Sequence, residues 1–120
     1  MVTVGAPGVH GAVTAGTASG YADAASRPSF AAPIYAVWRE EAVPADAPPL
    51  FLAHASDDPL VSPLESVKLY TAWQAAGRRA ELHIYAEGGH GFALWPQDLP
   101  SDTWIDSFWM WLVAEGFVPE

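Results

Sequence analysis

Two segments constrain the fold of this chain more than any others: PPLFLAHASDDPLVSP, at residues 48–63, and AELHIYAEGGHGF, at residues 80–92. Each begins with an apolar run of strand character and ends in a turn, and the two turns carry Asp58 and His90. The continuous run LFLAH is typical of a parallel strand that is covered on both faces. Because open α/β sheets bind ligands at the carboxyl ends of their strands, we expect an acid and a base at that edge.

The remaining pattern places these two strands in an alternating α/β arrangement. A short strand is predicted at residues 1–5, a buried strand at 30–38 that Pro33 weakens, a helix at 64–76 and a last helix at 101–115. Strands that alternate with helices indicate a parallel sheet with right-handed crossovers. With 120 residues, the chain is expected to form a single α/β domain.

Composition excludes several classes of function. The net charge of −9 opposes binding to nucleic acid or to an anionic membrane surface. There is no cysteine, so a thiolate nucleophile, a disulfide and a zinc-thiolate site are all excluded. The sequence shows neither a secretory signal nor an apolar run long enough to span a membrane, so a cytoplasmic location is the default expectation. The six tryptophans are expected mainly in the core.

The first turn offers two carboxylates. Asp58 lies four residues after His54, and Val61, three residues further, is expected to pack back into the fold, so we prefer Asp58 to its neighbour Asp57. A carboxylate at this place can orient a histidine and stabilise its imidazolium form. Asp-Asp-Pro is also a common turn sequence, so a purely structural role is the alternative.

His90 is the strongest candidate for a catalytic base. The glycines around it in EGGHGF free the backbone and leave the imidazole accessible, and its titration range suits general base catalysis near neutrality. Phe92 and Leu94 are expected to pack beneath this loop. Trp95, beside it in ALWPQD, is the one tryptophan that we consider a candidate for a substrate pocket.

Three other histidines have simpler explanations. His54 ends an apolar strand and is expected to be a structural residue bonded to the backbone, His83 is expected on the strand surface, and His10 has no evident partner. A metal site built from Asp57, Asp58 and the histidines matches no known ligand spacing. We therefore expect no metal and no cofactor.

Taken together, the segments resemble the C-terminal half of an α/β-hydrolase, in the branch of acetyl esterases and dienelactone hydrolases. The resemblance covers residues 27–120 and rests on SRPSFAAPIYAVW, on the two turn segments and on the closing FWMWL helix. It implies a partial α/β-hydrolase fold with about three or four mainly parallel strands flanked by helices. In that family, the residues that match Asp58 and His90 are the acid and the base of the catalytic triad.

The chain departs from the family at its start. A GxSxG turn should carry the nucleophilic serine, but MVTVGAPGVHGA stands in its place, and the aligned positions are Pro7 or Gly8. Residues 1–26 are thus interpreted as a degenerate elbow region. Ser19, in GTASG, is the best substitute nucleophile because its small neighbours permit close approach; Ser29, Ser56 and Ser62 are weaker candidates.

Three functional hypotheses follow. The first is an esterase of small acyl esters with low activity, in which His90 activates an unrecognised serine or a water molecule. The second is a non-catalytic hydrolase fragment, and the third is a subunit whose site is completed by another chain. Because only MVTVG is available to cover the strand at residues 30–38, we also expect a homodimer formed through an exposed sheet edge.

Overall fold

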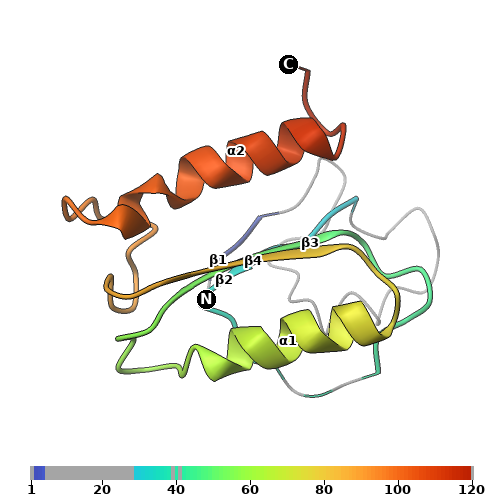
Figure 1. Cartoon of the computed structure of the whole chain (residues 1–120), viewed down its shortest axis with the longest axis horizontal. Helices are drawn as coiled ribbons and strands as arrows, with labels where there is room; N and C mark the ends of the chain where they lie inside the picture. Colours follow the sequence, from blue (N-terminus) through green and yellow to red (C-terminus); the bar gives the residue numbers. More distant parts are fainter. Residues whose placement is uncertain (1, 5–28, 39, 41, 120) are drawn as a thin grey trace.

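A four-stranded sheet with one helix on each face forms the body of the molecule. The computed structural model describes residues 2–4, 29–38, 40 and 42–119. Its strands are β1 (Val2–Val4), β2 (Ala32–Ile34), β3 (Leu50–Ala55) and β4 (Ala80–Tyr85), which lie side by side in that order. Helices α1 (Leu64–Ala75) and α2 (Trp104–Ala114) cover opposite faces of the sheet, and the 3-10 helix η3 (Pro100–Thr103) precedes α2 (Figure 1). Three parallel strands flanked by helices confirm the predicted fold class.

The pairing of β3 with β4 decides where the two turns meet. All six residues of β3 pair in parallel with β4, from Leu50↔Ala80 to Ala55↔Tyr85. Both strands therefore end at the same level, and both bounds agree with the sequence prediction to within one residue. Helix α1 connects the two strands and begins and ends within one residue of its predicted bounds. Gly77, which has a φ of +71°, follows shortly after the last residue of the helix and terminates it.

Side chains of β3 point alternately into two apolar clusters. Phe51, Ala53 and Ala55 face the α2 side, where they pack with Phe108, Trp111 and other aromatic residues. Leu50 and Leu52 face the α1 side and pack with Leu69 and Trp73. This alternation is the normal strand period of two, and it places His54 on the face that α1 covers.

Four of the six tryptophans are buried, as predicted: Trp38, Trp73, Trp104 and Trp111. Trp109 is 56% exposed, so its assignment to the core was wrong. The buried residues of α2, Trp104, Phe108, Trp111 and Leu112, form a narrow stripe. Ile105 and Trp109 each lie about 100° further around the helix than Trp104 and Phe108, which turns them toward solvent.

Strand β2 is shorter than the nine-residue strand predicted at 30–38. Regular pairing covers only Ala32–Ile34, although residues 30–36 are all buried. Pro33 has no N–H to donate to a neighbouring strand, and Tyr35 has a φ of +45°, which ends the extended conformation. The buried segment at residues 30–36 is therefore longer than the regular strand at its centre.

Strand β1 confirms the predicted terminal strand, and it runs antiparallel to β2. Val2 pairs with Ile34 and Val4 with Ala32, so Val4 lies at the amino end of β2. That end is opposite to the edge at which β3 and β4 deliver their turns. Among the helices of the described ranges, none is long and apolar enough to cross a membrane.

Candidate active site

Asp58 is fixed by the turn that follows β3. Its Oδ1 accepts hydrogen bonds from the backbone N–H groups of Leu60, at 2.8 Å, and Val61, at 2.9 Å. Such a turn closed by an aspartate side chain explains the preference for this residue type at this position. The carboxylate itself has no exposed surface. Its second oxygen, Oδ2, therefore has a defined direction.

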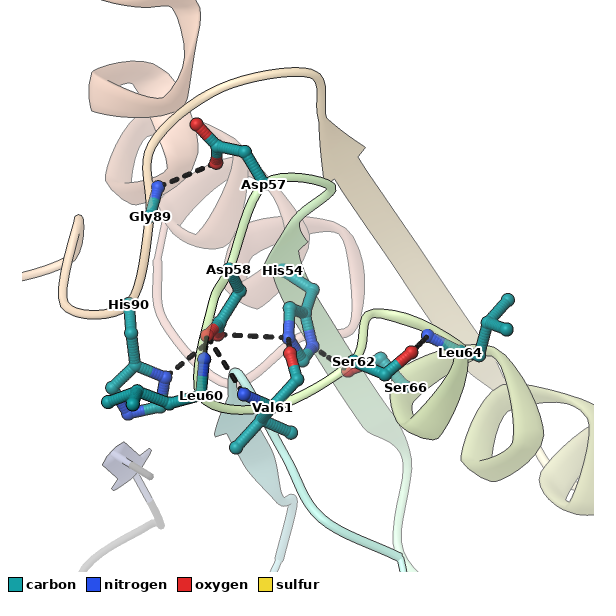
Figure 2. A network of polar contacts seen from close by, with 10 residues as sticks. All are labelled: His54, Asp57, Asp58, Leu60, Val61, Ser62, Leu64, Ser66, Gly89 and His90. Atoms are coloured by element: carbon teal, nitrogen blue, oxygen red, sulfur yellow. Dashed lines mark hydrogen bonds and ion pairs between the residues drawn. The ribbon is translucent and has the colours of Figure 1, made fainter.

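That second oxygen meets His90. Oδ2 of Asp58 lies 2.8 Å from Nδ1 of the imidazole, and the His90 side chain retains 23% exposure (Figure 2). Because a carboxylate only accepts hydrogen bonds, Nδ1 carries the proton in this contact. The other ring nitrogen, Nε2, is then available to exchange a proton with a reacting group. The structure thus brings together the two side chains that the sequence singled out.

The carboxylate is held in its ionised form. Burial by itself would raise the pKa of Asp58, but the hydrogen bonds from Val61, His90 and Leu60, together with the charge of His90, outweigh it. The pKa of Asp58 is therefore lowered from its ordinary value. An ionised, buried carboxylate against Nδ1 is the arrangement that orients an imidazole and stabilises its protonated form.

Glycines shape the loop that carries His90, as predicted. Gly88, Gly89 and Gly91 have φ values of +155°, +67° and +104°, a region that residues with a side chain rarely adopt. A Cβ atom on Gly88 would lie 2.9 Å from the Oγ atom of Ser101. The loop can approach η3 this closely only because residue 88 has no side chain.

Asp57, the alternative acid, ties the two turns together. Its Oδ1 accepts a hydrogen bond of 2.8 Å from the backbone N–H of Gly89. The Asp57 side chain is exposed, and in the part of the chain that the structure describes it makes no contact with the imidazole of His90. The geometry therefore favours Asp58 as the partner of the base.

Tyr35 is a site residue that the sequence analysis missed. Its ring centroid lies 4.5 Å from that of His90, and it packs edge-on against Phe92. The residue is almost fully buried, and its hydroxyl has no hydrogen-bond partner among the described residues. Burial first, and then the charge of Asp58, raise the pKa of this hydroxyl above its ordinary value. No sequence signal pointed to this residue, because Tyr35 lies inside the strand predicted at residues 30–38.

His54 and His83 lie where they were predicted. His54 is fully buried, and its Nε2 donates to the backbone carbonyl of Val61 at 2.9 Å. Its proximity to Asp58, 3.2 Å between Nε2 and Oδ2, was not predicted. His83 is partly exposed and bonds to Glu81. His10 lies outside the described residues.

Predictions around the loop had mixed outcomes. Phe92 is buried beneath it, but Leu94 is 62% exposed, so the prediction that it packs there was wrong. The backbone N–H of Leu94 donates to the carbonyl of Gly91, and this tight turn directs the side chain outward. Trp95 is 71% exposed. The neighbouring cavity, of about 190 Å³, is lined instead by Phe92, Ala93, Pro96, Asp102, Trp104 and Ile105.

The nucleophile is not identified in the described ranges. Ser19 lies outside them, as do Pro7 and Gly8. Ser29, Ser56 and Ser62 are exposed, and no serine hydroxyl in the described part of the chain is hydrogen-bonded to His90. In the same part of the chain, no group of three or more potential metal ligands comes together.

Comparison with known families identifies the origin of this geometry. The model of the prolyl oligopeptidase family matches residues 20–115. The chain belongs to the prolyl oligopeptidase family. The match covers both turn segments, so a member of this family carries the Asp58–His90 pair described above. No match was found among curated protein sequences.

Solved structures place this family member in the α/β-hydrolase fold. The acetyl ester-xyloside bifunctional hydrolase of Caldicellulosiruptor lactoaceticus has a TM-score of 0.70 and 24% identity, with 82% of this chain and 48% of that chain covered. MGS-M1, an α/β-hydrolase enzyme from a deep-sea metagenome of the Medee basin, has a TM-score of 0.66 and 22% identity over 83% and 50%. The carboxylesterase Cest-2923 of Lactobacillus plantarum has a TM-score of 0.59 and 24% identity over 65% and 32%.

These likenesses confirm the predicted partial α/β-hydrolase fold. The chain spans about half the length of the first two structures and about a third of the third.

Proposed function

We propose that the chain carries the acid and the base of a hydrolase site that acts on small carboxylic esters. The observation that carries the proposal is the 2.8 Å contact between Asp58 Oδ2 and His90 Nδ1, at the edge where β3 and β4 end. Ester substrates are favoured because solved structures with the same fold include an acetyl ester hydrolase and a carboxylesterase.

In this mechanism His90 transfers the proton and Asp58 keeps the imidazole in the right tautomer. Nε2 of His90 takes a proton from the attacking hydroxyl, whose oxygen bonds to the carbonyl carbon of the ester. The imidazolium then donates this proton to the departing alcohol. Asp58 remains ionised throughout, which its lowered pKa favours.

The attacking group is the open part of the proposal. Ser19 is the candidate within the chain, a water molecule activated by His90 is the second, and a residue of another polypeptide is the third. A site with neither the serine nor a complete oxyanion hole is slow, since one missing hole donor alone costs about 10²–10³-fold in rate. We therefore expect low activity if water is the nucleophile.

Hydrolysis of p-nitrophenyl acetate tests the proposal. We expect His90→Ala to abolish activity and Asp58→Asn to lower kcat by up to about 10⁴-fold, because the asparagine amide favours the wrong tautomer. Asp57→Asn is the matched control and should stay within about threefold, since Asp57 only bonds to a backbone N–H. Activity that is unchanged in His90→Ala would refute the ester-hydrolase function.

Two additional measurements identify the nucleophile and the bond that is cleaved. Labelling by a fluorophosphonate that disappears in Ser19→Ala assigns the nucleophile to Ser19, whereas unchanged labelling rules this serine out. Because the family is named for oligopeptide cleavage, p-nitroacetanilide is the amide counterpart of the ester. We expect the ester to react faster, and the reverse order would contradict the substrate class.

A second candidate function is an incomplete hydrolase that is assembled with another chain. It is favoured by the direction of β1, whose last residue lies at the end of the sheet opposite to the site edge. The two edges of the described sheet also differ. β1 reads VTV without a charge, whereas β4 carries Glu81 and His83, which discourage edge pairing. We propose a homodimer through β1, and a monomer at micromolar concentration by light scattering would contradict it.

A further inference from the structure

A buried chain of polar side chains continues behind the Asp58–His90 pair. It runs from Ser66 on α1 through His54 on β3 to the Asp58 carboxylate (Figure 2). Ser66 and His54 both have no exposed surface. Polar groups in such a place are costly unless all of them are hydrogen-bonded. The question is therefore what this arrangement contributes to the site.

The contacts of His54 define its tautomer. The carbonyl oxygen of Val61 can only accept, so Nε2, at 2.9 Å, carries the proton. In the neutral ring, Nδ1 then accepts the hydroxyl proton of Ser66 across 2.7 Å. Both ring nitrogens are satisfied, and the N–H of Nε2 also faces Oδ2 of Asp58 at 3.2 Å.

Val61 connects the two functional halves of this network. Its N–H donates to Oδ1 of Asp58, while its carbonyl accepts from His54. Asp58 and His54 are therefore both hydrogen-bonded to Val61, one through its N–H and the other through its carbonyl. Oδ2 in turn meets two imidazoles: it accepts a hydrogen bond from Nδ1 of His90, and Nε2 of His54 lies 3.2 Å away. Rotation of the carboxylate would break contacts to both histidines.

We propose that His54 is a positioning residue that holds the Asp58 carboxylate in the orientation in which Oδ2 meets Nδ1 of His90. The inference deepens the proposed function, on which its catalytic consequence rests. The groups that face Asp58 come from three places: His54 on β3, His90 in the loop after β4, and Tyr35 after β2. Of these, only His54 is itself anchored to a helix, through Ser66 on α1.

The test compares two substitutions of similar polarity. A glutamine amide reaches as far as Nε2 does, so His54→Gln keeps a donor for Val61 and Asp58. An asparagine amide reaches only as far as Nδ1, so His54→Asn keeps the Ser66 contact alone. The readout is the tautomer of His90 by ¹⁵N NMR of the imidazole ring, measured at about pH 8.5, where an ordinary histidine is neutral. Nδ1–H at His90 reports an intact contact with Asp58.

We expect the Nδ1–H tautomer in wild type and His54→Gln, and the Nε2–H tautomer in His54→Asn and in Asp58→Asn. A wild-type tautomer in a folded His54→Asn would overturn the inference and leave His54 a packing residue. Should His54→Asn fail to fold, Ser66→Ala is the milder variant. This substitution removes one hydrogen bond, whose free energy corresponds to a factor of about ten, so the His90 Nδ1 proton should exchange with water about tenfold faster. Unchanged exchange would equally overturn the inference.

Activity separates this inference from the proposed function. If wild type hydrolyses no ester but the tautomers follow the expected pattern, the proposed function fails and the positioning role stands. If ester hydrolysis is found, His54→Asn should lower kcat about 10²-fold, the cost of a misplaced catalytic group, with little change in KM. His54→Gln should remain close to wild type in both parameters.

Discussion

The loop that holds the acid and the loop that holds the base are built differently. Residues 56–63 close on the Asp58 side chain, which is buried and contacts two backbone N–H groups and two imidazoles. Residues 86–99 instead depend on glycines with positive φ, and within the described ranges His90 is held by one hydrogen bond and one ring contact.

This difference assigns separate tasks to the two loops. Asp58 is positioned by several contacts at once, two backbone N–H groups at Oδ1 and two imidazoles at Oδ2. The base is determined by few contacts and stays partly exposed, as a group that exchanges protons with a substrate must be. Changes in the glycine loop should therefore displace His90, whereas changes near Asp58 should act first on its charge and direction.

The largest effect is expected from a side chain on the glycine loop. Gly88→Ala adds a Cβ 2.9 Å from Ser101 Oγ at a residue with a φ of +155°. Strain and overpacking together should lower the free energy of unfolding by about 2–5 kcal/mol. Gly89→Ala, whose Cβ would meet nothing within 4 Å, is the matched control, and its backbone strain should cost about 1–2 kcal/mol. Urea denaturation measures both; equal losses would show that close packing on Ser101 is unimportant.

An intermediate effect is expected from acid. Because the pKa of Asp58 is lowered in the folded state, its ionised form stabilises the protein above the ordinary aspartate pKa of about 3.9. This stabilisation is lost as the pH falls through the lowered folded-state value. Asp58→Asn should therefore lose less stability than wild type between about pH 5 and pH 2, measured by urea denaturation. An equal loss in both would mean that the carboxylate is not held as described.

The smallest effect is expected at the unpaired hydroxyl. Tyr35→Phe keeps the ring contact with His90 and removes a buried hydroxyl that no described residue pairs with, so stability should rise by about 1 kcal/mol. Tyr85→Phe is the control, since its hydroxyl is likewise buried without a partner in the described ranges and its ring packs on Phe92. A loss of stability in Tyr35→Phe alone would show that this hydroxyl has a partner.

Sequence patterns predicted those parts of the fold that follow from local physics. The strands at 50–55 and 80–85 and the helix at 64–75 come from continuous apolar runs and from breaks at proline and glycine. Asp58 and His90 could be singled out because each lies in the turn that follows such a strand. Their 2.8 Å contact then depends on the register of β3 and β4, which periodicity indicates only in outline.

Features set by long-range packing were beyond such reasoning. The break in β2 at Tyr35 requires a positive φ that no tyrosine pattern announces. The exposure of Trp109 depends on how closely α2 approaches the sheet. His54, which lies close to Asp58, is hydrogen-bonded to Ser66, twelve residues away on another element. In each case the neighbouring element, rather than the local sequence, decides the outcome.

The full parallel pairing of β3 with β4 has a consequence for the evolution of this site. Acid and base are both delivered by one strand–helix–strand unit at residues 50–90, while β1 lies at the far edge of the sheet. Insertions, deletions or new partners at β1 thus leave the acid–base pair in register. Recombination that moves this unit would therefore carry Asp58 and His90 together, with their contact intact.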